Sequence, residues 1–276
     1  LNTIVDYASM KTYVHGYSEK ESCRLADQAG TLTELLHGDI AYPAGSRVLE
    51  AGCGVGAQTL TLSRSSPDAR FECMDISEVS LDAARQMAAS QQLANVAFRQ
   101  GDIYHVPYRA DSFDHVFVCF VLEHLSDPLK ALAGLRRVLK PGGTLTVIEG
   151  DHGSYYCHPQ SRAADLAVQC LVEIQAKAGG DALIGRRLYP LLTDAGYCAV
   201  AVSPRMVYVD ASRPALVDGF TRKTFIAMVE GVRDQALAMG LIDRQTWNQG
   251  IADLYRTTQA DGTFCYTFFK GVGIKR

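Results

Sequence analysis

Short apolar segments alternate with helix-like segments along the first 150 residues. Strand-like runs occupy residues 47–52, 69–77, 95–103, 113–125 and 143–150. Between them, helical periodicity covers residues 58–65, 79–93 and 128–140. The last of these segments places Leu129, Leu132, Leu135 and Leu139 on one face. Strands that alternate with helices at this spacing predict right-handed crossovers and a parallel sheet.

The second half of the chain has a less regular pattern. Residues 161–179 read as one long helix, and residues 185–197 as a helix that Gly196 stops. Residues 198–210 are β-rich, and the aromatic run 263–275 reads as a final strand. We therefore expect an N-terminal helical segment at 1–40, serving as a lid or in oligomerisation, and a catalytic domain at 41–276. Within that domain, residues 211–262 form a helical insertion before the last strand.

Composition excludes several classes of protein. The 276 residues are 47% hydrophobic and 21% charged, with a formal net charge of −3, so neither nucleic acid nor an anionic membrane is an expected partner. No apolar run approaches the roughly 18 residues that a membrane span needs. The polar N-terminal stretch lacks a secretory signal, which predicts a cytoplasmic protein. The eight cysteines contain no C-x-x-C pair, so we expect neither a disulfide framework nor a zinc site.

The stretch VLEAGCGVGAQT, residues 48–59, places glycines at alternate positions after a strand and an acid, Glu50, just before them. A dinucleotide fold would need G-x-G-x-x-G, and a pyrophosphate would be repelled by Glu50. The spacing therefore disfavours a nicotinamide oxidoreductase. S-adenosylmethionine carries a cationic sulfonium and an ammonium group, which suit this acid. A second acid for its ribose, Asp75, follows the next strand, and Asp102 follows the third, although both could also be helix or turn caps.

Four motifs in order carry a family resemblance: LEAGCGVG, MDIS, GDIYHVPYRADSFDHVFVCFVLEHLSDP and LRRVLKPGGTLTVIE. They span roughly residues 40–150, and the chain resembles class I S-adenosylmethionine-dependent methyltransferases of the ubiquinone and menaquinone C-methyltransferase subgroup. A teleocidin-type terpenoid or indole alkaloid C-methyltransferase is one suspected relative. The resemblance implies an α/β, Rossmann-like sheet of seven strands with helices on both faces. The cofactor-binding residues that we expect are Glu50, Gly52, Cys53, Gly54, Gln58, Asp75, Ile76, Gly101, Asp102, Ile103, Cys119 and His124.

The acceptor pocket is expected around EGDHGSYYCHPQ, residues 149–160, because this segment follows the fifth strand and crowds histidines, tyrosines and an acid together. A solvated loop is the alternative interpretation. A metal site at Asp151, His152 and His158 is disfavoured, because methyl transfer from a sulfonium needs no metal. The expected catalytic residues are Tyr17, His152 and His158. The expected substrate-binding residues are Tyr13, Phe120, Asp151, Tyr155 and Tyr208.

These residues predict a methyltransferase that acts on a small organic molecule. The site offers tyrosines and histidines but no evident nucleophile, which favours C-methylation of a prenylated or quinone-like secondary metabolite, with S-adenosylhomocysteine as the other product. The alternatives are a small-molecule O-methyltransferase with a histidine general base, and a non-catalytic cofactor-binding protein. We also expect a homo-oligomer, because the N-terminal segment and the helical insertion exceed what the sheet needs for cover.

Overall fold

A central twisted sheet organises the structure, a computed structural model that describes residues 32–276. Its strand order is β3-β2-β1-β4-β5-β8-β6, and β7 also pairs with β8. The first five strands run parallel, while β8 is antiparallel to β5, β6 and β7. The strands are β1 (Arg47–Ala51), β2 (Arg70–Asp75), β3 (Val96–Gln100), β4 (Phe113–Cys119), β5 (Leu139–Gly150), β6 (Tyr156–His158), β7 (Cys198–Val209) and β8 (Thr263–Ile274).

Helices surround this sheet, and a short helical segment at residues 32–37 precedes β1. The α-helices are α2 (Ala57–Ser65), α3 (Glu78–Ser90), α4 (Pro128–Val138), α5 (Arg162–Lys177), α6 (Leu188–Asp194), α7 (Pro214–Leu216), α8 (Ala227–Gly231), α9 (Arg233–Ala238) and α10 (Arg244–Arg256). The shorter or irregular turns are η2 (Ile103–His105), η3 (Leu122–His124), η4 (His152–Ser154), η5 (Ile184–Arg187) and the π-helix η6 (Val217–Ile226).

Local sequence signals explain where the helices begin. The Ser77 and Ser161 hydroxyls accept hydrogen bonds from backbone amides in the first turns of α3 and α5. The Asp127 carboxylate does the same for α4, whose first residue is Pro128. Each side chain satisfies one amide that has no partner within its helix, and proline at the first position loses no hydrogen bond.

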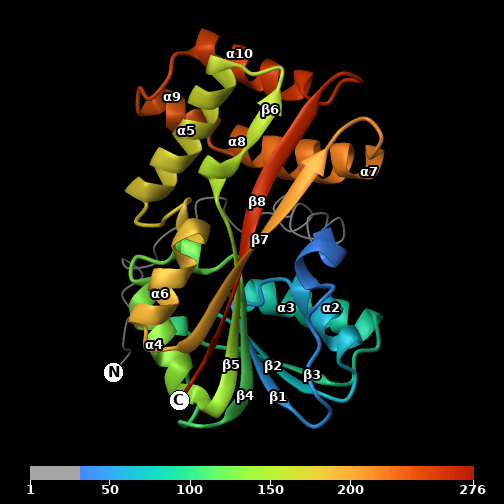
Figure 1. The fold of residues 1–276 in the computed structure, drawn as a ribbon, viewed down its shortest axis with the longest axis vertical. Coiled ribbons are helices and arrows are strands. Elements are labelled where there is room, and N and C mark those ends of the chain that lie inside the picture. Colours follow the sequence, from blue (N-terminus) through green and yellow to red (C-terminus); the bar gives the residue numbers. More distant parts are fainter. Residues whose placement is uncertain (1–31) are drawn as a thin grey trace, which may run out of the picture.

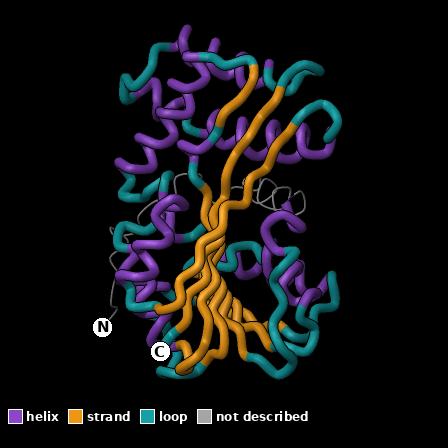
Figure 2. Tube along the Cα trace, viewed as in Figure 1, coloured by secondary structure: helices purple, strands orange, loops and turns teal. Residues whose placement is uncertain are grey.

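The molecule has two lobes that share two long strands (Figures 1 and 2). The sheet lobe contains β1–β5, the helices α2, α3, α4 and α6, and residues 268–274 of β8, which pair with β5. The helical lobe contains β6, residues 263–267 of β8, α5, α7–α10 and η6. Because β7 pairs with β8 along residues 264–274, these two strands run from one lobe into the other.

Apolar side chains cover both faces of the sheet. One core lies between the sheet and α4 and α6, and includes Leu49, Val116, Leu135 and Leu188. The other core lies on the α2 face and continues into the helical lobe, where Phe264 and Trp247 belong to it. The carboxyl ends of the parallel strands therefore meet at the junction between the lobes, which is where ligands bind in open α/β sheets.

The fold confirms the expected α/β architecture, including the mainly helical stretch between β7 and β8. The sheet has eight strands rather than seven, because β6 forms inside residues 149–160, which we interpreted as a loop, and pairs with β8. Residues 1–31, and with them Tyr13, Tyr17 and most of the expected lid, lie outside the described residues. Among the described helices, none is long and apolar enough to cross a membrane.

Candidate functional site

The glycine loop after β1 has a backbone conformation that residues with side chains rarely adopt. Gly52, Gly54 and Gly56 all have positive φ angles, of 84°, 51° and 82°. A Cβ at Gly52 would overlap the Val121 side chain, and one at Gly56 would lie 2.7 Å from Met87. Among residues 32–276, no atom beyond Gly54 and its chain neighbours would lie within 4 Å of a Cβ at this position, so the described part of the chain leaves this backbone open. The loop is thus packed against protein at its two ends and open in the middle, where a ligand could approach the chain.

Asp75 ties this loop to the end of β2. One carboxylate oxygen accepts a hydrogen bond from the Gly54 amide at 2.8 Å, and the other accepts one from the Ser77 amide at 2.9 Å. Burial raises the pKa of Asp75, and these amide donors oppose the shift. The next residue, Ile76, is 58% exposed, so a carboxylate and an open apolar surface stand side by side. That pairing suits a ribose and an adenine face.

The acid at the end of β1 is buried rather than open to a ligand. Glu50 is 2% exposed, and its Oε2 accepts a hydrogen bond from the Thr59 hydroxyl at 2.6 Å. Burial raises the pKa of Glu50 to about 7. Gln58 lies in the first turn of α2, and its side-chain oxygen is buried without a hydrogen-bond partner among the described residues. Cys53 is also buried, and burial raises its pKa, which keeps the thiol protonated.

The third acid lies after β3. Asp102 accepts a hydrogen bond from the Tyr104 amide at 2.8 Å and lies 2.9 Å from His105 Nδ1, so it serves as the N-cap of η2. Ile103 packs at the edge of the core formed with α4. A Cβ at Gly101 would lie 2.6 Å from the Met74 sulfur, which explains the glycine there. Asp75 and Asp102 thus follow neighbouring strands at one edge of the sheet.

The turn after β4 is conformationally unusual. Phe120 has a φ angle of 57°, a region that bulky side chains rarely occupy, and its ring lies 5.6 Å from the Phe268 ring. The next residue, Val121, contacts Gly52 of the glycine loop. Cys119 is buried, and burial raises the pKa of its thiol well above the usual value, so it offers no thiolate.

Glu149, which we did not single out from the sequence, anchors this turn. Its side chain is fully buried at the end of β5, and its Oε1 accepts hydrogen bonds from the amides of Val121 at 3.1 Å and Leu122 at 2.7 Å. Its Oε2 has no hydrogen-bond partner within residues 32–276. Burial, followed by the nearby Glu123 charge, raises the pKa of Glu149 well above its usual range. An acid at the end of a predicted strand was the only signal for it.

A second group of polar residues follows β5. Asp151 forms a two-pronged ion pair with Arg186, at 2.6 and 2.7 Å. His152 is 5% exposed, and its Nδ1 lies 2.7 Å from the Tyr266 hydroxyl of β8. Its Nε2 lies 3.7 Å from the Glu123 carboxylate, and His124 Nε2 lies 3.5 Å from the same side chain. Tyr266 also packs against Phe268, which links His152 to Phe120 through β8.

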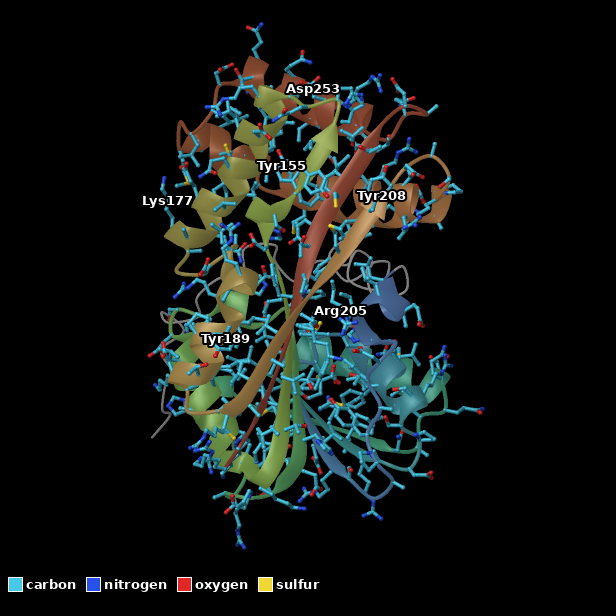
Figure 3. The ribbon with its side chains drawn as sticks, in the orientation of Figure 1. Tyr155, Lys177, Tyr189, Arg205, Tyr208 and Asp253 are labelled. Atoms are coloured by element: carbon cyan, nitrogen blue, oxygen red, sulfur yellow. The ribbon has the colours of Figure 1, made fainter. Side chains whose placement is uncertain are left out.

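The other expected acceptor residues lie in the helical lobe (Figure 3). Tyr155 donates a hydrogen bond to Asp165 and packs on Phe225 and Phe264. Tyr208 is 41% exposed on β7.

His158 is exposed and pairs with Thr263, three residues along β8 from Tyr266 and about 10 Å away. Residues an odd number of positions apart on a strand point to opposite faces of the sheet. Thr263, and with it His158, therefore faces away from Tyr266, and the structure does not bring His158 to His152. Within residues 32–276 there is also no cluster of three or more histidine, cysteine, aspartate or glutamate residues that could hold a metal ion.

Comparisons with known proteins agree with this geometry. Residues 49–147 match the methyltransferase domain family. An uncharacterised methyltransferase of Schizosaccharomyces pombe is 32% identical over 183 residues, covering 64% of each chain. Demethylmenaquinone methyltransferase of Staphylococcus aureus is 35% identical over 112 residues, covering 40% of this chain and 46% of the relative. The chain thus spans less than two thirds of the length of these curated relatives.

A solved structure shares the fold. Phosphoethanolamine N-methyltransferase 2 of Haemonchus contortus, in complex with S-adenosylmethionine, superposes with a TM-score of 0.55 at 16% identity, covering 89% of this chain and 52% of that chain. Residues 49–147 thus carry a methyltransferase domain, and the shared fold agrees with the resemblance to class I S-adenosylmethionine-dependent methyltransferases.

S-adenosylmethionine is the cofactor of this domain, and the residues present fit it. The open backbone at Gly54 can pass the methionine part, and Asp75 with the exposed Ile76 can hold the adenosine part. The buried, unpartnered oxygen of Gln58 is a further polar group beside the glycine loop. When bound, the cofactor supplies an electrophilic methyl group on a positively charged sulfur.

Proposed function

We propose that this protein transfers a methyl group from S-adenosylmethionine to carbon of a small organic acceptor, a prenylated or quinone-like compound. The observation that carries the proposal is the apolar and aromatic cluster after β4, where the partly exposed Phe120 packs on the buried Phe268 beside the protonated Cys119. A carbon acceptor attacks with its π electrons and needs no activated nucleophile from the protein. Its positive charge after transfer is favoured by aromatic faces.

The name of one relative supports the substrate class. Demethylmenaquinone methyltransferase shares 35% identity with this chain over 112 residues. The shared stretch amounts to 40% of the chain, so this relative supports the cofactor in the proposal more than it supports the choice of acceptor. The acceptor itself is therefore proposed from chemistry, as a neutral molecule with an electron-rich ring or alkene.

The residues of the chain contribute alignment and exclusion of water. The Val121 side chain packs against Gly52 and so connects the turn after β4 to the glycine loop. Glu149 holds the same turn by accepting hydrogen bonds from two of its backbone amides. A rigid turn of this kind can hold the acceptor in line with the transferred methyl group, which can contribute several kcal/mol to catalysis. A proton must then leave the acceptor, and we assign its removal to the region of His152.

O-methylation is the second candidate, and one observation favours it. His152 lies between a tyrosine hydroxyl and a carboxylate, an arrangement that can take a proton from a phenol or alcohol as well as from carbon. The products distinguish the two reactions, because a methyl group on carbon and one on oxygen have different chemical shifts.

The test is to incubate the protein with methyl-deuterated S-adenosylmethionine and three acceptor probes: demethylmenaquinol, a prenylated indole and a catechol. We expect S-adenosylhomocysteine release with one of the first two, and deuterated methyl on carbon by NMR. Methylation of the catechol oxygen alone would overturn C-methylation in favour of the second candidate. Tight cofactor binding without any turnover would instead indicate a non-catalytic binding protein.

A further inference from the structure

Three buried side chains from different parts of the chain meet where the two lobes join. They are Tyr266 on β8, His152 on η4 and Glu123 on η3, exposed by 2%, 5% and 8%. The Tyr266 hydroxyl lies 2.7 Å from His152 Nδ1, and His152 Nε2 lies 3.7 Å from Glu123 Oε2. The order hydroxyl, imidazole, carboxylate is the arrangement by which a buried imidazole makes a hydroxyl oxygen a better base.

The Glu123 carboxylate, 3.7 Å from Nε2, indicates which nitrogen of His152 carries the proton. A carboxylate accepts protons and cannot donate one when ionised, so the Glu123 side favours the proton on Nε2. Nδ1 is then the acceptor, and the Tyr266 hydroxyl must donate to it. Burial raises the pKa of Tyr266 well above its usual value, so the phenol keeps its proton available for this hydrogen bond.

The hydroxyl of Tyr266 lies next to Gly150, at the carboxyl end of β5. A Cβ at Gly150, the last residue of β5, would overlap this hydroxyl, so the glycine provides its space. The Tyr266 ring packs 4.7 Å from Phe268, which in turn contacts Phe120 after β4. The Tyr266 hydroxyl thus lies beside Gly150 at the carboxyl end of β5, and its ring belongs to the aromatic cluster that we propose for the acceptor side.

The carboxylate end of this arrangement is also held in place. Gln175 of α5 donates to the Glu123 backbone oxygen at 3.0 Å and to its Oε2 at 3.3 Å. A substitution that removes the Glu123 charge would therefore change the surroundings of the His152 imidazole, while Gln175 of α5 would still hold the backbone of residue 123. In the part of the chain that the structure describes, His124, Glu149, Asp151 and Arg186 are further titratable or charged groups near this arrangement.

We propose that Tyr266 is the catalytic group that accepts the acceptor's proton, with His152 receiving the phenol proton and Glu123 positioning the imidazole. This inference rests on the proposed function. After the acceptor has gained the methyl group, its C–H electron pair returns to the acceptor and the proton passes to Tyr266 Oη. The proton of Tyr266 moves to His152 Nδ1, and the resulting imidazolium faces the Glu123 carboxylate.

The hydrogen-bond assignment can be tested without any acceptor, by nitrogen-15 NMR of histidine-labelled protein saturated with S-adenosylhomocysteine. We expect His152 to carry its proton on Nε2, with Nδ1 shifted by the Tyr266 hydrogen bond. Y266F should remove that shift, and E123Q should move the tautomer population toward Nδ1–H. The matched control is Y197F, which removes a buried hydroxyl that donates to the Leu132 carbonyl and should leave His152 unchanged.

A His152 proton on Nδ1, with no response to Y266F, would overturn the assignment. For the catalytic role, Y266F should lower kcat at least tenfold with the acceptor probe that the wild-type protein methylates, while the Kd for S-adenosylhomocysteine stays within twofold. An unchanged kcat would overturn that role. Absence of turnover by the wild-type protein would instead count against the proposed function, and the NMR result would still decide the hydrogen bonds.

Discussion

The two lobes bury different kinds of side chain. The buried acidic and basic residues of the described chain all belong to the sheet lobe or to the junction: His37, Glu50, Glu123, Glu149, Asp151, His152 and Lys270. The helical lobe instead buries aromatic rings, such as Phe220, Phe225 and Phe264, whose centroids lie 4.7 to 6.0 Å apart along β8 and η6. Its buried polar side chains are uncharged: the hydroxyls of Thr221, Thr224 and Thr257, and the amide of Gln175 on α5.

This difference separates two tasks. Burying an ionisable group costs free energy unless it is paired, so such groups persist where they bind or react. An aromatic core has no such cost and mainly supplies packing. We infer that the sheet lobe and the junction carry the chemistry, whereas the helical lobe shapes and closes the acceptor side.

The largest expected effect comes from a substitution that disrupts the packing of the helical lobe. F264A removes a fully buried ring that contacts Tyr155, Phe220 and Phe225, and should reduce the free energy of unfolding by about 3–5 kcal/mol. The matched variant in the sheet lobe is F113A, because Phe113 is equally buried. Native-state hydrogen exchange measures each variant.

If the lobes are separable, F264A lowers protection mainly in α5 and α10, and F113A mainly in β1 and β4. Equal loss of protection throughout the molecule in both variants would show that the lobes unfold as one unit, and would contradict the division of tasks.

The next effect concerns His37, a buried imidazole at the sheet lobe. Burial lowers its pKa from 6.5 to about 4, and the neighbouring Gln58 side chain opposes only part of this shift. The unfolded chain therefore binds a proton between these pH values while the folded chain does not, so stability falls as the pH drops from 6.5 to 4. We expect a loss of about 3 kcal/mol over this range, attributable to His37 alone.

Glu50 acts in the opposite direction, because its raised pKa, about 7, makes stability fall as the pH rises above 4.5. The measurement is therefore the difference in urea unfolding between wild type and H37L at pH 7 and pH 4, in which the Glu50 contribution cancels. A difference that does not change with pH would show that the folded chain protonates His37 as readily as the unfolded chain does, and would contradict the lowered pKa.

The third effect tests whether the sheet lobe binds the cofactor. D75A removes a carboxylate that holds the Gly54 amide and that we expect to bind the ribose hydroxyls. Cofactor affinity should fall by about 1.5–3 kcal/mol, or roughly 10- to 150-fold. D75N is the matched control, because it keeps one acceptor oxygen and should lose less.

Isothermal titration calorimetry with S-adenosylmethionine, S-adenosylhomocysteine and NAD gives the three affinities directly. Unchanged dissociation constants in D75A would reduce Asp75 to a loop anchor. Tight NAD binding by the wild-type protein would contradict the site as a whole.

The sequence predicted the parallel half of the fold well, because short apolar-rich strand segments alternate there with helical segments along the chain. It missed β6, since residues 156–158 are too few to show a period and are ordered by pairing with β8, more than 100 residues later. The glycine loop and Asp75 were recognisable because their spacing along the chain sets their geometry. Tyr266 was not, because only the fold brings it to His152 across 114 positions.

The strand β8 has a consequence for synthesis on the ribosome. Its residues 268–274 complete the sheet lobe beside β5, and its residues 263–267 form the centre of the helical lobe between β6 and β7. Every other strand of both lobes is therefore translated before the strand that joins them. Neither lobe can reach its final pairing cotranslationally until β8 has emerged, and until then β5 and β7 expose edges that invite chaperone binding or aggregation.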